Sequence, residues 1–240
     1  MKQLATILTA GMLVFMTCPI YAQTIPVDHF RKIIISPYIQ VTFVQGDEES
    51  VTINNIIVDS SKLHVEVHGN TLRMYLDGAK EIPHTQQNYH RLYPDHAVTA
   101  TVVYRKLNTL SLRGSESFLC QSPLSADRFT LRVYGESPVI FKEVHINRMY
   151  TTLYGESSLD IQAGAVNKQH YVCYGEGKIN TTAIAGQEAR VTAYGEAEFA
   201  VNVSDRIKIT SFGDARLRYM GSPTIVKGIH IGEMDLKRID

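Results

Sequence analysis

The sequence lacks the features that would direct it to a specialised chemistry. Tryptophan is absent from the 240 residues, and 13 tyrosines carry most of the aromatic content. The 24 basic residues balance the 24 acidic ones, so the net charge of zero gives no global attraction to nucleic acid or to an anionic membrane. No nucleophile motif, phosphate-binding loop or Cys-x-x-Cys pair occurs. The composition is that of an ordinary β protein without a catalytic signature.

Long apolar runs are equally scarce, and the only one lies at the N-terminus. Lys2 precedes an apolar stretch over residues 4–15, and a signal-type cleavage site lies between Ala22 and Gln23. The run is short for a membrane span, so residues 1–22 are predicted to be a secretory signal peptide. Cys18 offers a lipoprotein alternative, although the residues before it fit a lipobox poorly. In either case we expect an exported protein, in the periplasm or at the outer-membrane surface.

A glycine recurs at steps of 18 to 21 residues through the second half of the chain. The six copies are Gly114, Gly135, Gly155, Gly175, Gly195 and Gly213. Most of them are preceded by an aromatic residue and followed by an acidic one. A period near 20 residues indicates a stacked structural repeat.

Apolar and polar side chains alternate on both sides of each glycine. In the second repeat, Leu131 and Val133 flank Arg132 before the glycine, and Val139 and Phe141 follow it. A period of two is typical of strands with one buried face, and no segment shows the 3.6-residue period of a helix. One unit cannot bury its apolar face alone, whereas stacked units share a core. We therefore predict an all-β, single-stranded β-helix, or β-solenoid, with coils of about 20 residues.

Stacking would place like residues of successive coils over one another, about 4.8 Å apart. The residues before the glycines are expected to form a tyrosine row, made of Tyr134, Tyr154, Tyr174 and Tyr194 and continued by Phe212. The residues after the glycines are expected to form a glutamate row, made of Glu136, Glu156, Glu176 and Glu196 and continued by Asp214. The tyrosines and glutamates of both rows are the candidate ligand-binding residues.

Cysteine is rare, and its positions argue against a disulfide. Removal of the leader leaves Cys120 and Cys173, which belong to coils three steps apart. Three steps of about 4.8 Å place them about 14 Å apart, beyond the roughly 7 Å that bridged Cα atoms allow. Both are expected to be inert core thiols.

Residues 23–110 show the same alternation without the regular glycine. Residues 30–44 predict an irregular first coil, in which Ser36-Pro37 takes the place of the glycine. Two strands flanking Gly69-Asn70 predict a β-hairpin, which we expect to cap the open end of the solenoid.

Two further segments complete the predicted organisation. Residues 78–96 are polar and without periodicity, and predict a long loop. Residues 111–240 are predicted to hold the regular coils and a C-terminal cap, because the repeat decays after Gly213.

Three features carry a family resemblance. They are Phe30-Arg31-Lys32-Ile33 leading to Val41-Thr42-Phe43-Val44-Gln45-Gly46, then Gly69-Asn70-Thr71-Leu72-Arg73-Met74, and the glycine-centred repeats. In these features, over residues 30–232, the chain resembles the head GIN domain family of putative autotransporter adhesins. That family usually carries Ser-Gly-Ser-Gly-like repeats, whereas this chain carries Tyr-Gly-Glu-Ser. The resemblance implies a right-handed β-helix and an exported bacterial envelope protein, and it brings no catalytic or binding residues.

The tyrosine row allows two interpretations. Outward tyrosines beside carboxylates could stack on sugar rings and hydrogen-bond their hydroxyls, or could contact a protein. Stacked tyrosines could equally serve only to stabilise the coils. We expect a non-catalytic binding module for a surface glycan or envelope protein, with no nucleic acid partner. The alternative is a structural envelope component without a discrete ligand.

The glutamate row also allows a metal-binding and an enzymatic interpretation. A row of oxygen ligands suits Ca²⁺, but a specific site usually needs six or more oxygens, so a solvated edge is the simpler interpretation. Retaining glycosidases hold two carboxyl groups about 5 Å apart, yet every neighbouring pair in such a row meets that distance. Near-identical surroundings also create no unlike acid–base pair. We therefore expect no enzyme activity and no cofactor.

Histidines give a weaker signal for metal. His64, Glu66 and His68 share one face of a strand, but strand residues four apart are about 13 Å apart at the backbone, so a solvated face is favoured over zinc. His84, His90 and His96 lie in the long loop, where no geometry is predicted.

Overall fold

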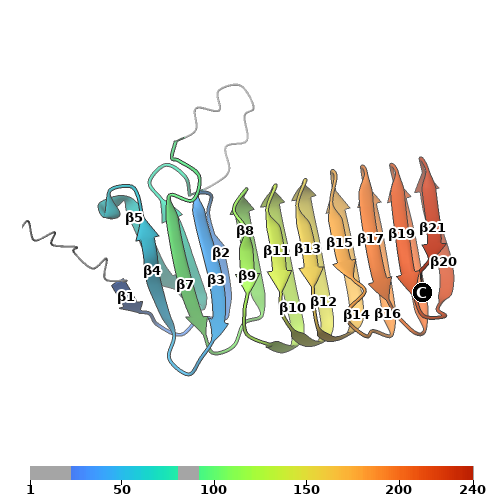
Figure 1. The fold of residues 1–240 in the computed structure, drawn as a ribbon, viewed down its shortest axis with the longest axis horizontal. Helices are drawn as coiled ribbons and strands as arrows, with labels where there is room; N and C mark the ends of the chain where they lie inside the picture. Colours follow the sequence, from blue (N-terminus) through green and yellow to red (C-terminus); the bar gives the residue numbers. More distant parts are fainter. Residues whose placement is uncertain (1–22, 81–91, 240) are drawn as a thin grey trace, which may run out of the picture.

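The computed structural model describes residues 23–80 and 92–239. The expected signal peptide with Cys18, and His84 and His90 of the long loop, lie outside the described residues. The described chain is an elongated stack of strands, running from β1 at one end to β20 and β21 at the other (Figure 1). The predicted all-β solenoid is confirmed, with one short 3₁₀ turn over Ser60–Lys62.

Two sheets form the long walls of the stack. The eleven-stranded sheet contains, in spatial order, β1 (Gln23–Pro26), β4 (Ser50–Ile56), β7 (Val98–Tyr104), β3 (Ile39–Gln45), β9 (Phe118–Cys120), β11 (Pro138–Phe141), β13 (Ser158–Ile161), β15 (Lys178–Thr181), β17 (Ala197–Asn202), β19 (Ala215–Met220) and β21 (Met234–Arg238). The ten-stranded sheet contains β20 (Thr224–Ile231), β18 (Arg206–Phe212), β16 (Glu188–Tyr194), β14 (Gly164–Tyr174), β12 (Val144–Gly155), β10 (Leu124–Gly135), β8 (Thr109–Gly114), β2 (Lys32–Ile35), β6 (Thr71–Leu76) and β5 (Leu63–His68).

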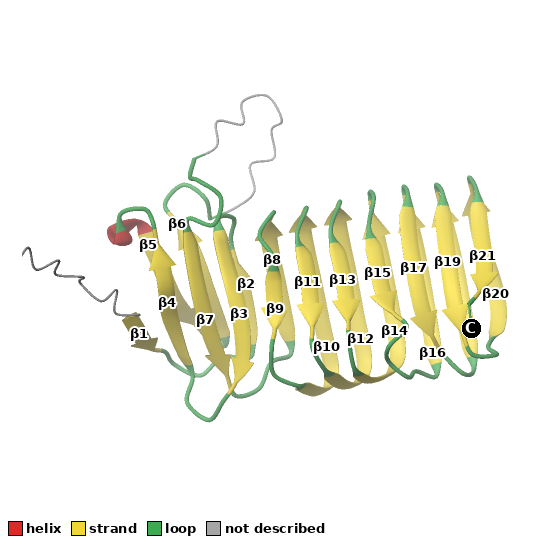
Figure 2. Cartoon of the chain, in the orientation of Figure 1, coloured by secondary structure: helices red, strands yellow, loops and turns green. Residues whose placement is uncertain are grey.

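Each regular coil contributes one strand to each sheet. The chain runs along a strand of the ten-stranded sheet, turns at the repeated glycine and returns along a strand of the eleven-stranded sheet, as the green turns of Figure 2 show. Strands of successive coils pair in parallel without a shift, so that Gly135 lies beside both Gly114 and Gly155. Every regular coil therefore repeats the position of the coil before it.

The core lies between the two sheets. Inward positions form columns of apolar side chains that are almost fully buried, such as Val139, Leu159, Ile179, Phe199 and Leu217. Cys120 in β9 and Cys173 in β14 also point inward; both are free and buried, on different sheets and three coils apart. Burial raises the pKa of the Cys173 thiol to about 12, so neither cysteine has the thiolate character that reactivity requires.

The N-terminal end departs from sequence order. The predicted first coil, β2 and β3, is an internal coil: β2 pairs with both β6 and β8, and β3 pairs with both β7 and β9. The alternation in residues 30–44 predicted where the two strands lie in the sequence. It contained no information on which later strands would pair with them. Pro37 lies against Gly114 at this turn, as predicted, and the positive φ of 70° falls on the next residue, Tyr38.

Antiparallel strands close this end, as the hairpin prediction requires. β5 and β6 pair across Gly69-Asn70, and β5 is the outermost strand of the ten-stranded sheet. The other sheet is closed by β4 and β1, which sequence reasoning did not place there. Antiparallel strands break the pattern of the coils, so the regular stack cannot continue past them.

The segment expected to hold a final coil and a cap forms β20 and β21. These strands continue the parallel pairing of β18 and β19, and they are the last strands of the two sheets. Gly232 occupies the repeated glycine position with a φ of +102°. Ile229 and Ile231 of β20 are about two-thirds exposed, because no further coil lies over them in the described chain.

The glycine column is what permits the two sheets to be joined by so tight a turn. At Gly155 the backbone has a φ of +92°, and an added Cβ would lie 2.4 Å from the carbonyl oxygen of Gly135. Both the conformation and the close approach of the neighbouring coil therefore require glycine.

We predict that Gly155→Ala destabilises the protein by about 1–3 kcal/mol, the usual cost of a strained left-handed residue. The expected result is a lower midpoint of urea unfolding, with Thr152→Ala on the same strand as the control. An unchanged midpoint for Gly155→Ala would show that the column tolerates a methyl group.

Candidate functional site

The tyrosine row exists as predicted. The rings of Tyr134, Tyr154, Tyr174 and Tyr194 lie 4.7–4.8 Å apart between centroids and 3–4° from parallel. Phe212 continues the row at 5.2 Å. The rings come from the carboxyl ends of β10, β12, β14, β16 and β18, where the parallel register places each over the last.

The stacking limits what the row offers to a ligand. An inner ring such as Tyr174 has a neighbouring ring against each face and is 40% exposed, so its free part is the edge and the hydroxyl. A sugar ring cannot lie flat on such a row, because stacking on an aromatic ring needs an open face. The row is therefore a line of phenol hydroxyls, rather than the sugar-stacking platform considered from the sequence.

Different side chains cover the two ends of the row. The guanidinium of Arg113 lies 5.8 Å from the centroid of the Tyr134 ring, a cation–π arrangement. At the other end Phe212 is paired in register with Ile231 of β20. Arginine and isoleucine stand in the register positions at the two ends of the row, where a tyrosine would continue it. The phenol hydroxyls are therefore confined to the four coils of Tyr134, Tyr154, Tyr174 and Tyr194.

The glutamate row follows the glycine column on its other side. Glu136, Glu156, Glu176 and Glu196 are all exposed at the corner where the chain passes from one sheet to the other. Near Glu176 and Glu196 the corner is hollowed to about 150 Å³, and Lys178 and Arg216 also line this hollow. Arg216 pairs with Glu198 at 2.8 Å, so basic groups already accompany the acids at this corner.

Buried serines fix the turn between the two rows. The Ser137 hydroxyl donates a hydrogen bond to the Gly114 carbonyl oxygen at 2.9 Å, and the Ser157 hydroxyl donates to that of Gly135 at 2.8 Å. Each serine ties its turn to the coil before it. These two bonds fix the turns at Gly135 and Gly155, whereas Gly177, Ala197 and Ala215 take the place of the serine in the later coils.

Glu116 lies two residues after Gly114, at the inner position that Ser137 and Ser157 occupy in the later coils. This is the turn where the regular coils meet the irregular one. Glu116 is only 2% exposed, and its carboxylate accepts hydrogen bonds from the backbone N–H groups of Ser115 and Tyr38. Burial raises the pKa of Glu116, opposed by those hydrogen bonds and by the nearby His96. The side chain supplies the link to Tyr38 that a serine supplies in later coils.

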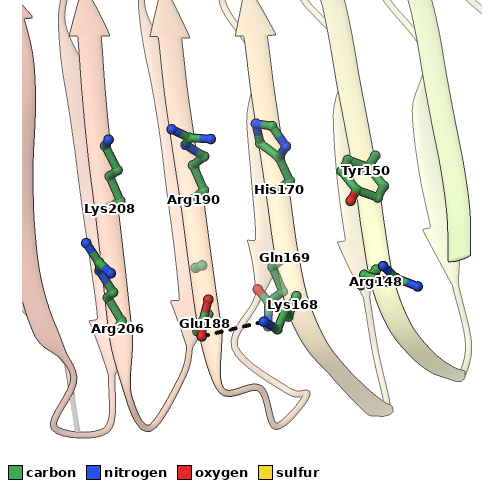
Figure 3. Close-up of a pocket in the computed structure, with 10 residues that line it drawn as sticks. Arg148, Tyr150, Lys168, Gln169, His170, Glu188, Arg190, Arg206 and Lys208 are labelled. Carbon is green, nitrogen blue, oxygen red and sulfur yellow. Dashed lines mark ion pairs between the residues drawn. The ribbon is translucent and has the colours of Figure 1, made fainter. Parts of the chain in front are cut away.

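A second surface was missed at the sequence level. Outward positions seven and five residues before the glycines carry mostly basic side chains, on the outer face of the ten-stranded sheet (Figure 3). They line a shallow hollow of about 340 Å³, and we call them the basic face: Arg148, Lys168, Arg190, Arg206 and Lys208, with Tyr150, His170 and Glu188. The same glycine alignment that gave the tyrosine row would have revealed this face, had these positions also been compared.

The basic face contains unneutralised charge. Arg148 pairs with Asp127 at 2.9 Å, and Lys168 approaches Glu188 at 3.8 Å. The side chains of Arg190, Arg206 and Lys208 make no ion pair or hydrogen bond within the described part of the chain. Three cations thus face solvent on neighbouring strands.

His170 lies among these cations and is half-buried between Tyr150 and Arg190 in register. Burial lowers the pKa of His170, and the positive charge of Arg190 lowers it further. His170 is therefore neutral at physiological pH.

The histidines predicted as a weak metal signal have other partners. His64 Nε2 lies 2.6 Å from an Asp77 oxygen and its ring stacks on Tyr75, whose hydroxyl donates to Glu66 at 2.7 Å. Within residues 23–80 and 92–239, no three His, Cys, Asp or Glu side chains gather closely enough to hold a metal ion. The fold thus directs His64 and Glu66 into pairs across the hairpin.

Comparison with known proteins agrees with this architecture. The family model described as putative auto-transporter adhesin, head GIN domain, matches residues 29–223. The chain belongs to this family. The resemblance inferred from the sequence is confirmed, and the matched range spans the irregular coil, the hairpin and the glycine repeats. A search of curated proteins found no match.

Solved structures share the fold at low sequence identity. A putative adhesin from Bacteroides fragilis has a TM-score of 0.75 at 20% identity, covering 91% of this chain and 96% of that one. A putative adhesin from Parabacteroides merdae has a TM-score of 0.66 at 15% identity, covering 92% and 96%. A putative lipid binding protein from Parabacteroides distasonis has a TM-score of 0.66 at 18% identity, also covering 92% and 96%. These likenesses show the fold.

No helix in the described ranges has the length and apolar character needed to span a membrane.

We predict that Arg190→Gln raises the pKa of His170 toward its ordinary value of about 6.5, because one of the two causes of its depression is removed. The measurement is an NMR titration of the histidine ring protons, with Arg132→Gln on β10 as the control. Since folding lowers the pKa, the unfolded chain binds the proton more readily, and stability falls as the pH drops below about 6.5. A pKa equal in both variants would exclude Arg190 as a cause.

Proposed function

We propose that this protein is a non-catalytic, exported binding module of the bacterial cell envelope, which presents the tyrosine and glutamate rows to a glycan. The family description as an auto-transporter adhesin supports surface binding and export.

The line of phenol hydroxyls carries the proposal. Four tyrosine hydroxyls at the coil spacing, beside four exposed carboxylates, form a rigid array of hydrogen-bonding groups. Phenol hydroxyls both donate and accept, and carboxylates accept strongly, so the array suits a ligand rich in hydroxyl groups. An extended neutral glycan has such groups along its whole length. A protein segment is the other ligand that this array would admit.

The same regularity argues against catalysis. General acid–base chemistry needs two groups whose pKa values are driven apart by unlike surroundings. The glutamates of the row are all exposed in the same turn of successive coils, so burial sets none of them apart from the others. Binding along a repeating ligand requires no such difference between them.

We predict that Tyr154→Phe with Tyr174→Phe abolishes glycan binding without loss of stability, because the hydroxyls are removed while the rings remain stacked. Phe212 already occupies the row as a phenylalanine. The measurement is a glycan and envelope-protein array probed with the chain from Gln23 onward, with and without calcium, beside thermal unfolding of each variant.

The corresponding alanine variants separate binding from a purely structural role. Tyr154→Ala with Tyr174→Ala removes the ring contacts and should cost about 1–3 kcal/mol of stability. If the phenylalanine pair binds as the parent does and only the alanine pair is impaired, the row is structural and the proposal fails. Signals that appear on protein spots and not on glycans would replace the glycan by a protein ligand.

A further inference from the structure

The basic face lies on the same sheet as the tyrosine row but several residues earlier along each strand. Two rows cross β12, β14, β16 and β18, and their successive members are paired in register. One row is Arg148, Lys168, Glu188 and Arg206, and the other is Tyr150, His170, Arg190 and Lys208. Arg148 and Lys168 are neighbours in one row and Arg190 and Lys208 in the other, so these cations lie about one 4.8 Å strand spacing apart along the solenoid axis. A linear array of charge is complementary to a linear polyanion.

We propose that the basic face binds an acidic polysaccharide, with its carboxylate or sulfate groups along Arg148, Arg190, Arg206 and Lys208. This site is separate from the tyrosine row and does not depend on the function proposed there. Guanidinium groups bind carboxylate and sulfate oxygens through paired N–H donors, and three of these four residues are arginines. Arg190, Arg206 and Lys208 have no intramolecular ion pair or hydrogen bond to give up within the described chain.

The rigidity of the face favours an extended partner. Its side chains project from paired strands, so their backbone positions are fixed before any ligand arrives (Figure 3). Glu188 lies in the lower row of Figure 3, between Lys168, which it approaches at 3.8 Å, and Arg206. Asp127 pairs with Arg148 from the neighbouring strand. The upper row of Tyr150, His170, Arg190 and Lys208 contains no acid. A chain of acidic sugars laid along the upper row of Figure 3 would contact His170, Arg190 and Lys208 in turn.

Other polyanions fit less well. A membrane surface would be expected to meet apolar side chains among the cations, but the exposed apolar residues of the described chain lie elsewhere, for instance at Ile229 and Ile231. Single-stranded nucleic acid is held by open aromatic rings. On this face the Tyr150 ring is covered by Arg128, 4.8 Å from its centroid, and contacts His170. The observations thus favour a polysaccharide.

Polygalacturonate is a suitable probe, with neutral dextran as its counterpart. The chain from Gln23 onward is expected to bind polygalacturonate and not dextran, and binding should weaken from about 0.05 to 0.5 M NaCl as the charges are screened. Arg190→Gln with Arg206→Gln and Lys208→Gln should weaken binding at least about tenfold, since three charge-assisted contacts are lost. These changes break no intramolecular ion pair within the described chain, and thermal unfolding checks that the fold is kept.

Two controls place the site. Lys142→Gln with Lys178→Gln and Lys237→Gln removes the same charge from the eleven-stranded sheet and its turns, and should change affinity less than about twofold if the contacts are local. Tyr154→Phe with Tyr174→Phe should retain polygalacturonate binding, whatever its effect on neutral glycans. On polygalacturonate binding, the NMR pKa of His170 should rise, because an anion then lies beside the ring.

Several results would overturn the proposal. The proposal fails if the parent chain does not bind polygalacturonate. It also fails if both triple variants lose the same affinity, because only net charge would then matter. Tighter binding to phosphatidylglycerol vesicles or to single-stranded DNA than to polygalacturonate would assign the face to another partner.

Discussion

Backbone hydrogen bonds between successive coils hold each residue beside the equivalent residue of the next coil. The distance between them is set by the strand spacing and not by the side chains. From β8 to β19 the two sheets pair in parallel without a shift, so a residue type repeated in the sequence becomes a row in space. The rows of tyrosines, glutamates and cations are consequences of this one constraint. Each row must be compatible with the strand spacing, which aromatic rings satisfy by stacking and carboxylates by remaining in water.

The constraint also explains which parts could be predicted. The alternation around Gly135 and Gly155 is local, so it defined the strands, the coil length and the tyrosine row before any coordinates were known. The position of β2 and β3 between β6–β7 and β8–β9 depends on pairing between distant segments, which a local pattern does not encode. The role of β1 and β4 at the N-terminal edge was hidden for the same reason. Ring orientation was likewise beyond the sequence: the alignment placed Tyr174 in a row but could not show that its faces were covered.

The distribution of charge shows how a balanced composition can mislead. The net charge of zero gives no global attraction to anions. Yet the register gathers the four glutamates of the row at the corner, and it gathers Arg148, Lys168, Arg190, Arg206 and Lys208 on the outer face of one sheet. Arg148, Arg190 and Arg206 lie far apart in sequence, and only the 20-residue register brings them onto one surface. In a repeat protein, charge is better summed by repeat position than over the chain.

The unshifted coil has a further consequence for how such a surface could change over evolution. Duplication of one 20-residue unit inside β10–β19 would insert a whole coil, and the coils on either side would keep their contacts. The insertion would lengthen every row by one side chain at once, and it would require no new type of turn or core packing. Avidity for a repeating polymer would then grow with the number of coils rather than by the refinement of any single contact.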